Sequence, residues 1–215
     1  MIEYIHMMKQ FRLDQLADSI FAIVMTILVF EIRVPEYAGI ISERVLINSL
    51  INIYPLFLSY LLSFSLIFTY WRSHHFIASV LVKNIDTSFA NLNGIFFFLV
   101  GLVPFSSHFL GTYIYSETAV VVFALNIILI GFSLFAMRRY AIKSQTIENT
   151  PFTKTENEHA LMHVIFPIIS AILAIFVSFI SINLAIVLFT LAILFNLSKN
   201  GTRYVFYIID LFRKK

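Results

Sequence analysis

The sequence predicts an all-α integral membrane protein with six transmembrane helices. Of its 215 residues, 60% are hydrophobic and only 13% are charged, whereas a soluble domain carries about 25% charged residues. The 24 phenylalanines add more apolar surface than a single soluble core of this size can bury. We therefore expect the lipid bilayer to be a partner of the chain and to cover much of its apolar surface.

Six segments are apolar and long enough, or nearly so, to cross the hydrocarbon, which takes about 20 residues. They comprise approximately residues 13–34, 45–71, 87–110, 113–137, 159–179 and 182–197. The last two are joined by very few residues, which predicts a tight antiparallel hairpin. Pro55, Pro104 and Pro167 lie within spans, where we expect kinks rather than helix ends. Residues 1–215 are thus predicted to form a single transmembrane domain.

Both ends of the chain admit a second interpretation. A signal peptide is the alternative for the first span, but Asp14 and Asp18 precede the apolar run and no small-x-small cleavage site follows. A retained span is therefore the better prediction. The tail at 201–215 mixes aromatic and basic residues, which is typical of an interfacial helix. We interpret it as a membrane-surface anchor, with partner binding as the alternative.

The basic residues predict the orientation in the membrane. Apart from Arg33 and Arg44, all of the 15 Lys and Arg residues fall on one side of the predicted spans. The excess of Lys and Arg marks the cytoplasmic side, so we expect both termini there. The net charge of +3 is too small to indicate a nucleic-acid partner. Because the chain has no cysteine, disulfides and thiolate metal sites are excluded.

The first span contains unusual polar residues. Its uninterrupted apolar part covers only residues 20–30, so Asp18 and Glu31 must lie near the edges of the hydrocarbon. An aspartate costs about 2.5–3.5 kcal/mol at the centre of a lipid-facing helix and less toward its ends. Such residues usually face protein or water, which indicates that this helix lies inside an assembly.

The faces of this helix can be laid out at about 100° per residue. Five side chains then form one stripe, which comprises Ser19, Ile23, Thr26, Ile27 and Phe30. Asp18 lies about 140° from Ile23 and does not share the stripe. Arg12 and Asp18 are about 120° apart, so each needs a partner on another helix or another subunit. Ordinary helix packing is the alternative interpretation of the stripe.

The histidines raise the question of a metal or haem site. His74 and His75 are adjacent, and His159 and His163 are four residues apart. No carboxylate stands at a persuasive spacing, so we expect hydrogen bonding or pH modulation and neither a metal nor another cofactor. The EHALMH segment lacks the His-Glu-x-x-His order of zinc proteases. Since phosphate loops and serine elbows are also missing from the sequence, we do not expect an enzyme.

Three segments resemble a known family. Arg12, Leu16, Ala17 and Asp18 resemble the Arg-x-x-x-Phe-Ser-Asp signature of the transmembrane protein 175 family of potassium channels, with Leu and Ala replacing Phe and Ser. YWRSHHFI at 70–77 is similar to the family's Trp-x-x-His-His segment, and residues 91–111 are similar to its third helix. The resemblance covers the first four spans and extends to the last two only in hydropathy.

The resemblance implies a prokaryotic six-helix subunit that assembles as a homotetramer, with the first helix of each subunit lining a central pore. Residues 1–215 would be one channel domain, and potassium the permeant ion. The family has no TVGYG filter. Its constriction is formed by apolar side chains, which correspond here to Ile23, Ile27 and Phe30, where the family usually has leucine at the last position. Ser19 and Thr26 would line the pore beside them.

Two further expectations concern the charged motif and the function. We expect Arg12 and Asp18 to lie off the stripe and to brace the helix, together with the other motif residues. The expected partners of these braces are Trp71, His74, His75, Asn91 and Asn93. A secondary transporter that uses Asp18 as an ion- or proton-coupling site is the alternative to a channel. Because the chain carries a single repeat of the motif, the resemblance implies a prokaryotic plasma membrane.

Overall fold

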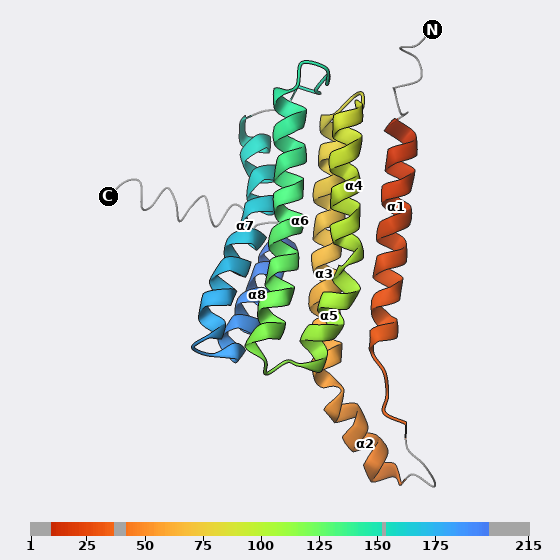
Figure 1. Ribbon diagram of the computed structural model, residues 1–215, viewed down its shortest axis with the longest axis vertical. Helices are drawn as coiled ribbons and strands as arrows, with labels where there is room; N and C mark the ends of the chain where they lie inside the picture. The colour runs from red at the N-terminus through yellow and green to blue at the C-terminus, as the bar shows by residue number, and fades with distance from the viewer. Residues whose placement is uncertain (1–9, 37–41, 152–153, 198–215) are drawn as a thin grey trace, which may run out of the picture.

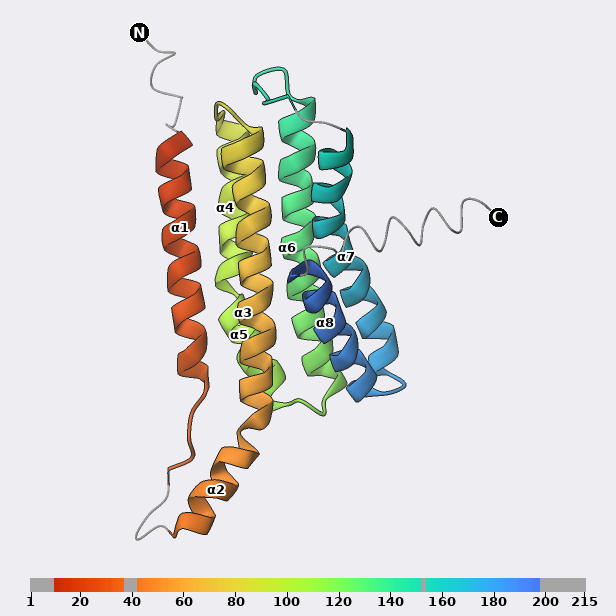
Figure 2. The same ribbon diagram turned by 180° about the vertical axis from the view of Figure 1, so that it is seen from behind.

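The computed structural model describes residues 10–36, 42–151 and 154–197, and every structural statement below concerns these residues. They form an all-helical bundle whose long helices run up and down beside one another (Figures 1 and 2). We call the end where the first helix begins the proximal end, and the opposite end the distal end. The predicted interfacial tail at 201–215 lies outside the described residues.

The elements follow in chain order. They are α1 (Gln10–Ile27), the 3₁₀ turn η2 (Leu28–Glu31), α2 (Glu43–Asn52), α3 (Tyr54–His75), the π-helix η3 (Phe76–Leu81), α4 (Thr87–Gly101), α5 (Val103–Thr112), α6 (Glu117–Lys143), α7 (Lys154–Ser178) and α8 (Ile182–Leu197). Five helical segments among the described residues are long and apolar enough to cross a membrane. With 16 residues, α8 is shorter than the roughly 20 that a span needs. The count of six spans therefore stays a prediction.

The second predicted span, at 45–71, is wrong in its first part. The helix is interrupted at Ile53, and α2 extends away from the bundle below α3 (Figure 1). Pro55 lies in the first turn of α3, where a missing N–H costs nothing. In a continuous helix, its ring would collide with the carbonyl of Ile51. This proline therefore separates two helices instead of kinking one.

The other two prolines lie within helical segments that continue past them. Pro104 lies in the first turn of α5, and only Leu102 separates α4 from α5, so the third span is bent but continuous. Pro167 lies inside α7. The hairpin between α7 and α8 is also present, since these helices are joined by three residues and pack against each other.

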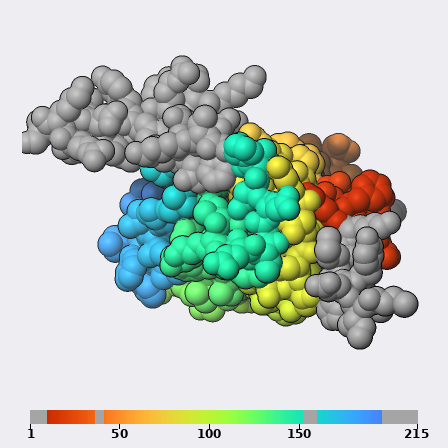
Figure 3. Space-filling model, turned by 90° about the horizontal axis from the view of Figure 1, so that it is seen from above, coloured from red at the N-terminus to blue at the C-terminus, as the bar shows by residue number. Residues whose placement is uncertain are grey.

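The bundle core is built around α6. This helix contacts α4, α5, α7 and α8, and its buried residues recur along most of its length. At the opposite side of the molecule from α7 and α8, α1 forms the edge of the bundle, as the view from the proximal end shows (Figure 3). It packs on α3, α4 and η3. One side of α1 is therefore left uncovered by the described residues of the chain.

A polar loop closes the proximal end. Asp86 caps α4 by accepting a 2.8 Å hydrogen bond from the backbone N–H of Phe89. It also accepts hydrogen bonds from the hydroxyls of Tyr140 and Thr146. Partial burial raises the pKa of Asp86, but these hydrogen bonds and one from the backbone of Ser88 outweigh it, so that the pKa lies below its ordinary value of 3.8. Asp86 thus holds the loop after α6 onto the start of α4.

Candidate permeation surface

One face of α1 is packed against the bundle. Its buried side chains follow a spacing of three or four residues, which keeps them on one side of a helix. They are Leu13, Ala17, Phe21, Val24 and Leu28, each no more than 6% exposed. The helix contacts α3, α4, α5 and η3. This face fixes the rotation of α1 about its own axis.

The predicted stripe lies on the uncovered side of the same helix. Ile23 is 57% exposed, Ile27 39% and Phe30 70%, and Ser19 and Thr26 are exposed as well. The described residues of one chain therefore do not cover the stripe, and ordinary helix packing against another copy stays an alternative interpretation. A row of large apolar side chains is left for lipid, for other subunits or for a pore.

The two hydroxyls of the stripe use their hydrogens within the helix. Ser19 Oγ donates to the carbonyl of Gln15 at 2.7 Å. Thr26 Oγ1 donates toward the carbonyls of Ala22 and Ile23, at 3.0 and 2.8 Å. Since a hydroxyl carries one hydrogen and two lone pairs, both oxygens keep acceptor capacity on the exposed side.

Asp18 is held from the side of α1 that adjoins α3. The indole Nε1–H of Trp71 donates to its Oδ1 at 2.9 Å. The ring of Trp71 in turn stacks on His75, with ring centroids 6.0 Å apart. Both rings belong to the last turns of α3, so this contact joins the proximal part of α1 to that helix.

A second polar contact lies deeper in the same region. His74 is 2% exposed, and its Nε2 lies 2.7 Å from Oδ1 of Asn93 on α4. The Asn93 amide donates to the carbonyl of Phe89, so its oxygen faces the ring and Nε2 of His74 must carry the hydrogen. The imidazole stacks on Phe96 at 5.0 Å and touches Phe21 of α1. Of the expected partners, Asn91 is exposed and takes part in neither contact.

Arg12 differs from the expectation that it lies off the stripe. Its side chain is exposed, and its direction around the helix is only about 20° from that of Ile23. Leu16, 48% exposed, points the same way. The described residues offer Arg12 neither a hydrogen bond nor an ion pair, so a brace within the subunit is not formed. Of the motif, Ala17 packs inward and Asp18 is bonded.

A polar row on α1 was not predicted from the sequence. Gln10, Asp14 and Asp18 recur every four residues and therefore lie along one side of the helix. Gln10 Nε2 donates to the carbonyls of Ala78 and Val82, both at 2.8 Å. Asp14 Oδ1 accepts a 2.9 Å hydrogen bond from the Ser79 hydroxyl. The four-residue spacing could have predicted this row. Its acceptors could not be predicted, because they are backbone carbonyls of η3 and of the residue that follows it.

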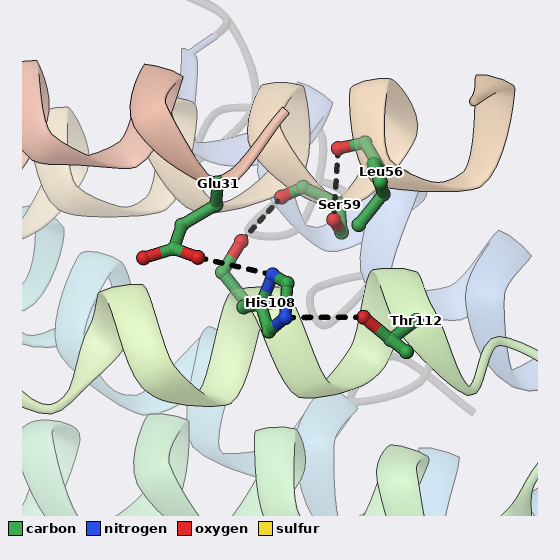
Figure 4. Close-up of polar contacts among 6 residues, drawn as sticks. Glu31, Leu56, Ser59, His108 and Thr112 are labelled. Carbon is green, nitrogen blue, oxygen red and sulfur yellow. Dashed lines mark hydrogen bonds and ion pairs between the residues drawn. The ribbon is translucent and has the colours of Figure 1, made fainter. Parts of the chain in front are cut away.

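At the distal end, α1 continues as η2 and meets α5. Glu31 Oε2 lies 3.0 Å from His108 Nδ1, and His108 Nε2 lies 3.3 Å from Thr112 Oγ1 (Figure 4). Beside them, Ser107 Oγ donates to the carbonyl of Ser59 on α3. The stripe of α1 thus ends next to a charged contact, because Phe30 immediately precedes Glu31.

Comparison with known proteins gives these features a context. Residues 12–104 match the model of the family described as endosomal/lysosomal potassium channel TMEM175. The fold matches the crystal structure of a lysosomal potassium-selective channel TMEM175 homolog from Chamaesiphon minutus, with a TM-score of 0.73 and 29% identity over 88% of this chain and 98% of that one. Over residues 12–104 this chain is thus similar to the TMEM175 family.

Curated relatives of the chain are named as potassium channels. A potassium channel of Chamaesiphon minutus is 39% identical over 103 residues, which cover 48% of this chain and 50% of the relative. A potassium channel of a Chryseobacterium species is 28% identical over 138 residues, or 64% of this chain and 68% of the relative. The chain thus spans only about half the length of the first of these relatives. The TMEM175 family is one of channels and not of enzymes.

The family model matches a shorter part of the chain than the resemblance in the sequence led us to expect. It ends at Pro104, within the third span, whereas we expected the similarity to extend through four spans. All of α1 from Arg12 onward, the end of α3 and the whole of α4 lie inside it. The stripe and the polar contacts of Asp18 and His74 therefore belong to the part of the chain that is most like TMEM175.

Proposed function

We propose that this chain is a potassium-selective channel of a prokaryotic plasma membrane, and that four copies assemble with their α1 helices around a central pore. The observation that carries the proposal is the stripe of α1, which is apolar and exposed although the opposite face of the same helix is packed. The edge position of α1 suits this arrangement, because a helix buried inside its own subunit could not reach a symmetry axis. We infer potassium as the permeant ion from the names of the relatives.

In this proposal Ile23, Ile27 and Phe30 form the constriction. Four copies of a bulky apolar side chain at one level narrow a pore and exclude water, so that a hydrated ion is resisted. Dilation or rotation of the α1 helices would open it. The packed face of α1 sets which residues face the axis, because a rotation would expose Phe21 or Val24 at a cost in buried area.

Selectivity for potassium over sodium requires either oxygen ligands or a difference between the two ions in the free energy of dehydration. Ser19 and Thr26 keep acceptor lone pairs on the stripe, because their hydrogens are directed to backbone carbonyls. A potassium ion that has lost part of its water could be met by the Thr26 oxygens between the levels of Ile23 and Ile27. Potassium gives up its waters more cheaply than sodium, so an apolar constriction favours it further.

The charge distribution supports an orientation with both termini in the cytoplasm. The described cations on the proximal segments are Arg12, Arg72, Lys83, Arg138, Arg139 and Lys143, whereas the distal segments carry Arg33 and Arg44. The side richer in Lys and Arg is the cytoplasmic one. In this orientation the contact between Glu31 and His108 faces outward.

The secondary transporter, our alternative, is less well supported. It requires Asp18 to face a cavity that alternates between the two sides. Asp18 lines an apolar groove beside α3, where its carboxylate accepts a hydrogen bond from Trp71 and is turned away from the stripe. Its place favours a role in positioning α1 over a role in ion coupling.

The proposal is tested with purified protein in liposomes. We expect passive potassium flux and the mass of four subunits in detergent. Ile23→Asn should raise the conductance or alter the preference for potassium, because a polar ring no longer excludes water. Ile172→Asn, on the exposed side of α7, is the control and should change neither. Saturable, proton-coupled uptake by a monomer would favour the transporter instead.

A further inference from the structure

An open cavity lies at the distal end of the bundle. It has a volume of about 560 Å³ and is bordered by the start of α3, the end of α5 and the loop that leads into α6. Arg33 and Pro35, in the linker after η2, also line it. The three long apolar segments at its border have their distal limits at Tyr54, Thr112 and Glu117. Because such segments end where the hydrocarbon meets the headgroups, the cavity lies at the boundary between membrane and water.

Arg33 gives the cavity a positive charge. Its side chain is exposed, and it makes no ion pair with the described residues. The other described cation of the distal segments, Arg44, does not line the cavity, and neither does any described carboxylate. A guanidinium presents its donors in a planar fork that matches phosphate and carboxylate groups. The charge of the cavity therefore favours an anion.

Neutral donors surround this cation. The side chains of Asn52, Tyr113 and Ser116 line the cavity and make no hydrogen bond with the described residues. Tyr115 is also part of the wall, and its hydroxyl is bonded to that of Tyr54 at a distance of 2.6 Å. A phosphate group offers several strong acceptor oxygens, so that it can bind a cation and neutral donors at once. Phosphate therefore suits this set of donors.

The rest of the wall favours a lipid over a free ion. It is apolar and comprises Pro35, Ile53, Pro55, Leu56 and Ile114. Beside it, Tyr113 and Tyr115 are 54% and 69% exposed in the loop between α5 and α6. Tyrosine is enriched at the level of the headgroups, because its ring is apolar and its hydroxyl is polar. A free phosphate ion would leave the apolar wall in water, whereas the glycerol and first methylenes of a lipid would cover it.

We propose that this cavity binds the phosphate headgroup of an anionic phospholipid, with the phosphate on Arg33. The orientation proposed above places this lipid in the outer leaflet. The inference goes beyond the proposed channel and does not depend on ion conduction. The bound headgroup connects the linker after η2 to α3, α5 and α6. It thus holds the connection between α1 and α2 against the bundle.

The test is native mass spectrometry of the purified protein in detergent, titrated with phosphatidylglycerol. One cation near a membrane surface contributes about five-fold to the binding of an anionic headgroup. Arg33→Gln should therefore weaken the binding of the first phosphatidylglycerol per subunit about five-fold. Arg44→Gln removes the other described distal cation and is the matched control, which should bind like the wild type. Phosphatidylcholine should bind the wild type more weakly, because its headgroup carries a cation of its own.

A second pair of variants tests the cavity without changing its charge. Asn52→Trp places an indole at the wall and should weaken the binding of phosphatidylglycerol, because the headgroup loses its space. Asn48→Trp, one turn earlier on the exposed surface of α2, is its control and should bind like the wild type. Unfolding temperatures show which variants are folded. If Arg33→Gln does not fold, Asn52→Trp decides the matter.

Three outcomes overturn the inference. The first is that Arg33→Gln and Asn52→Trp bind phosphatidylglycerol as tightly as the wild type. The second is that Arg44→Gln or Asn48→Trp weakens the binding equally, or that phosphatidylcholine binds as tightly. The third is that millimolar inorganic phosphate displaces the lipid, which would make the cavity a site for a free anion.

The channel proposal is tested separately, by potassium flux in liposomes. If the lipid binds as expected and no potassium passes, the channel proposal fails and the inference stands. If potassium passes and none of the variants changes lipid binding, the inference fails and the channel proposal stands.

Discussion

Trp71 Nε1 donates a 2.9 Å hydrogen bond to Asp18 Oδ1, and this contact joins α1 to the end of α3. The carboxylate lines an apolar groove together with Phe21, Met25, Phe68 and Trp71, among other residues. A charged oxygen in such surroundings is costly without a donor. We therefore interpret the indole N–H as the group that allows α1 to carry an aspartate within its span.

Removal of this donor should destabilise the protein. Trp71→Phe keeps most of the ring but leaves Asp18 without the indole hydrogen, which should cost about 1–3 kcal/mol. When Asp18 is already replaced by Ala, Trp71→Phe should lower stability much less. The effects of the two substitutions should therefore be non-additive. Thermal unfolding in detergent of the two single variants and the double variant measures this coupling. Additive effects would show that the bond contributes nothing.

The packing of α5 against α3 should not tolerate a methyl group at Gly111. A Cβ atom there would lie 2.5 Å from Ser59 Oγ and 2.9 Å from the backbone of Leu56. Because backbone cannot yield like a side chain, Gly111→Ala should lower stability by about 1–3 kcal/mol.

The control for this substitution is Gly94→Ala on α4. An added Cβ there meets nothing within 4 Å, so the substitution should stabilise the helix by about 0.5–1 kcal/mol. Unfolding temperatures of the two variants in one detergent provide the measurement. Equal effects at both positions would contradict the close approach of α3 and α5.

Asp86 should give the proximal end a pH-dependent stability. Because its pKa lies below 3.8 in the folded protein, its contribution is complete above the unfolded pKa and is lost as the pH falls through the folded value. Asp86→Ala removes the helix cap and should cost about 1 kcal/mol or more at pH 7. Below about pH 3.9, where the free carboxyl protonates, the difference from the wild type should shrink. Unfolding midpoints at pH 7 and pH 3 test this, and a constant difference would contradict it.

The polar row of α1 should hold the helix at the proximal end. Gln10→Ala removes two hydrogen bonds to the carbonyls of Ala78 and Val82. We expect faster hydrogen exchange in the first turns of α1 and in η3, because each lost bond contributes about 0.5–1.5 kcal/mol. Gln15→Ala, on an exposed side of the same helix, is the control. If Gln10→Ala left exchange in η3 unchanged, the described contact would not constrain this region.

The sequence was most informative where apolar spacing alone decides the structure. The stripe of α1 could be predicted because a helix fixes the direction of each side chain. The third apolar segment, predicted at 87–110 from hydropathy, lies within the helical segment Thr87–Thr112. The break at Ile53 was missed because apolar residues continue on both sides of it, and only the position of Pro55 marks it.

Contacts between distant parts of the chain were harder to predict. Trp71 and His74 were expected near the motif from their side of the membrane, but their different partners could not be assigned. Gln10 donates to backbone carbonyls, which are present whatever the residue type. The sequence therefore could not identify its partners. Glu31 and His108 are far apart in sequence, and a lone histidine near the end of a span predicts no partner.

The central claim is that the stripe of α1 faces the route of the ion, and thiol modification tests it most directly. Because the chain has no cysteine, Ile23→Cys and Leu173→Cys each introduce a single thiol, the second on the exposed side of α7. A cationic methanethiosulfonate reagent should reduce the potassium current through Ile23→Cys tetramers and leave Leu173→Cys unaffected. If Ile23→Cys is labelled to completion and its current does not change, α1 does not line the pore.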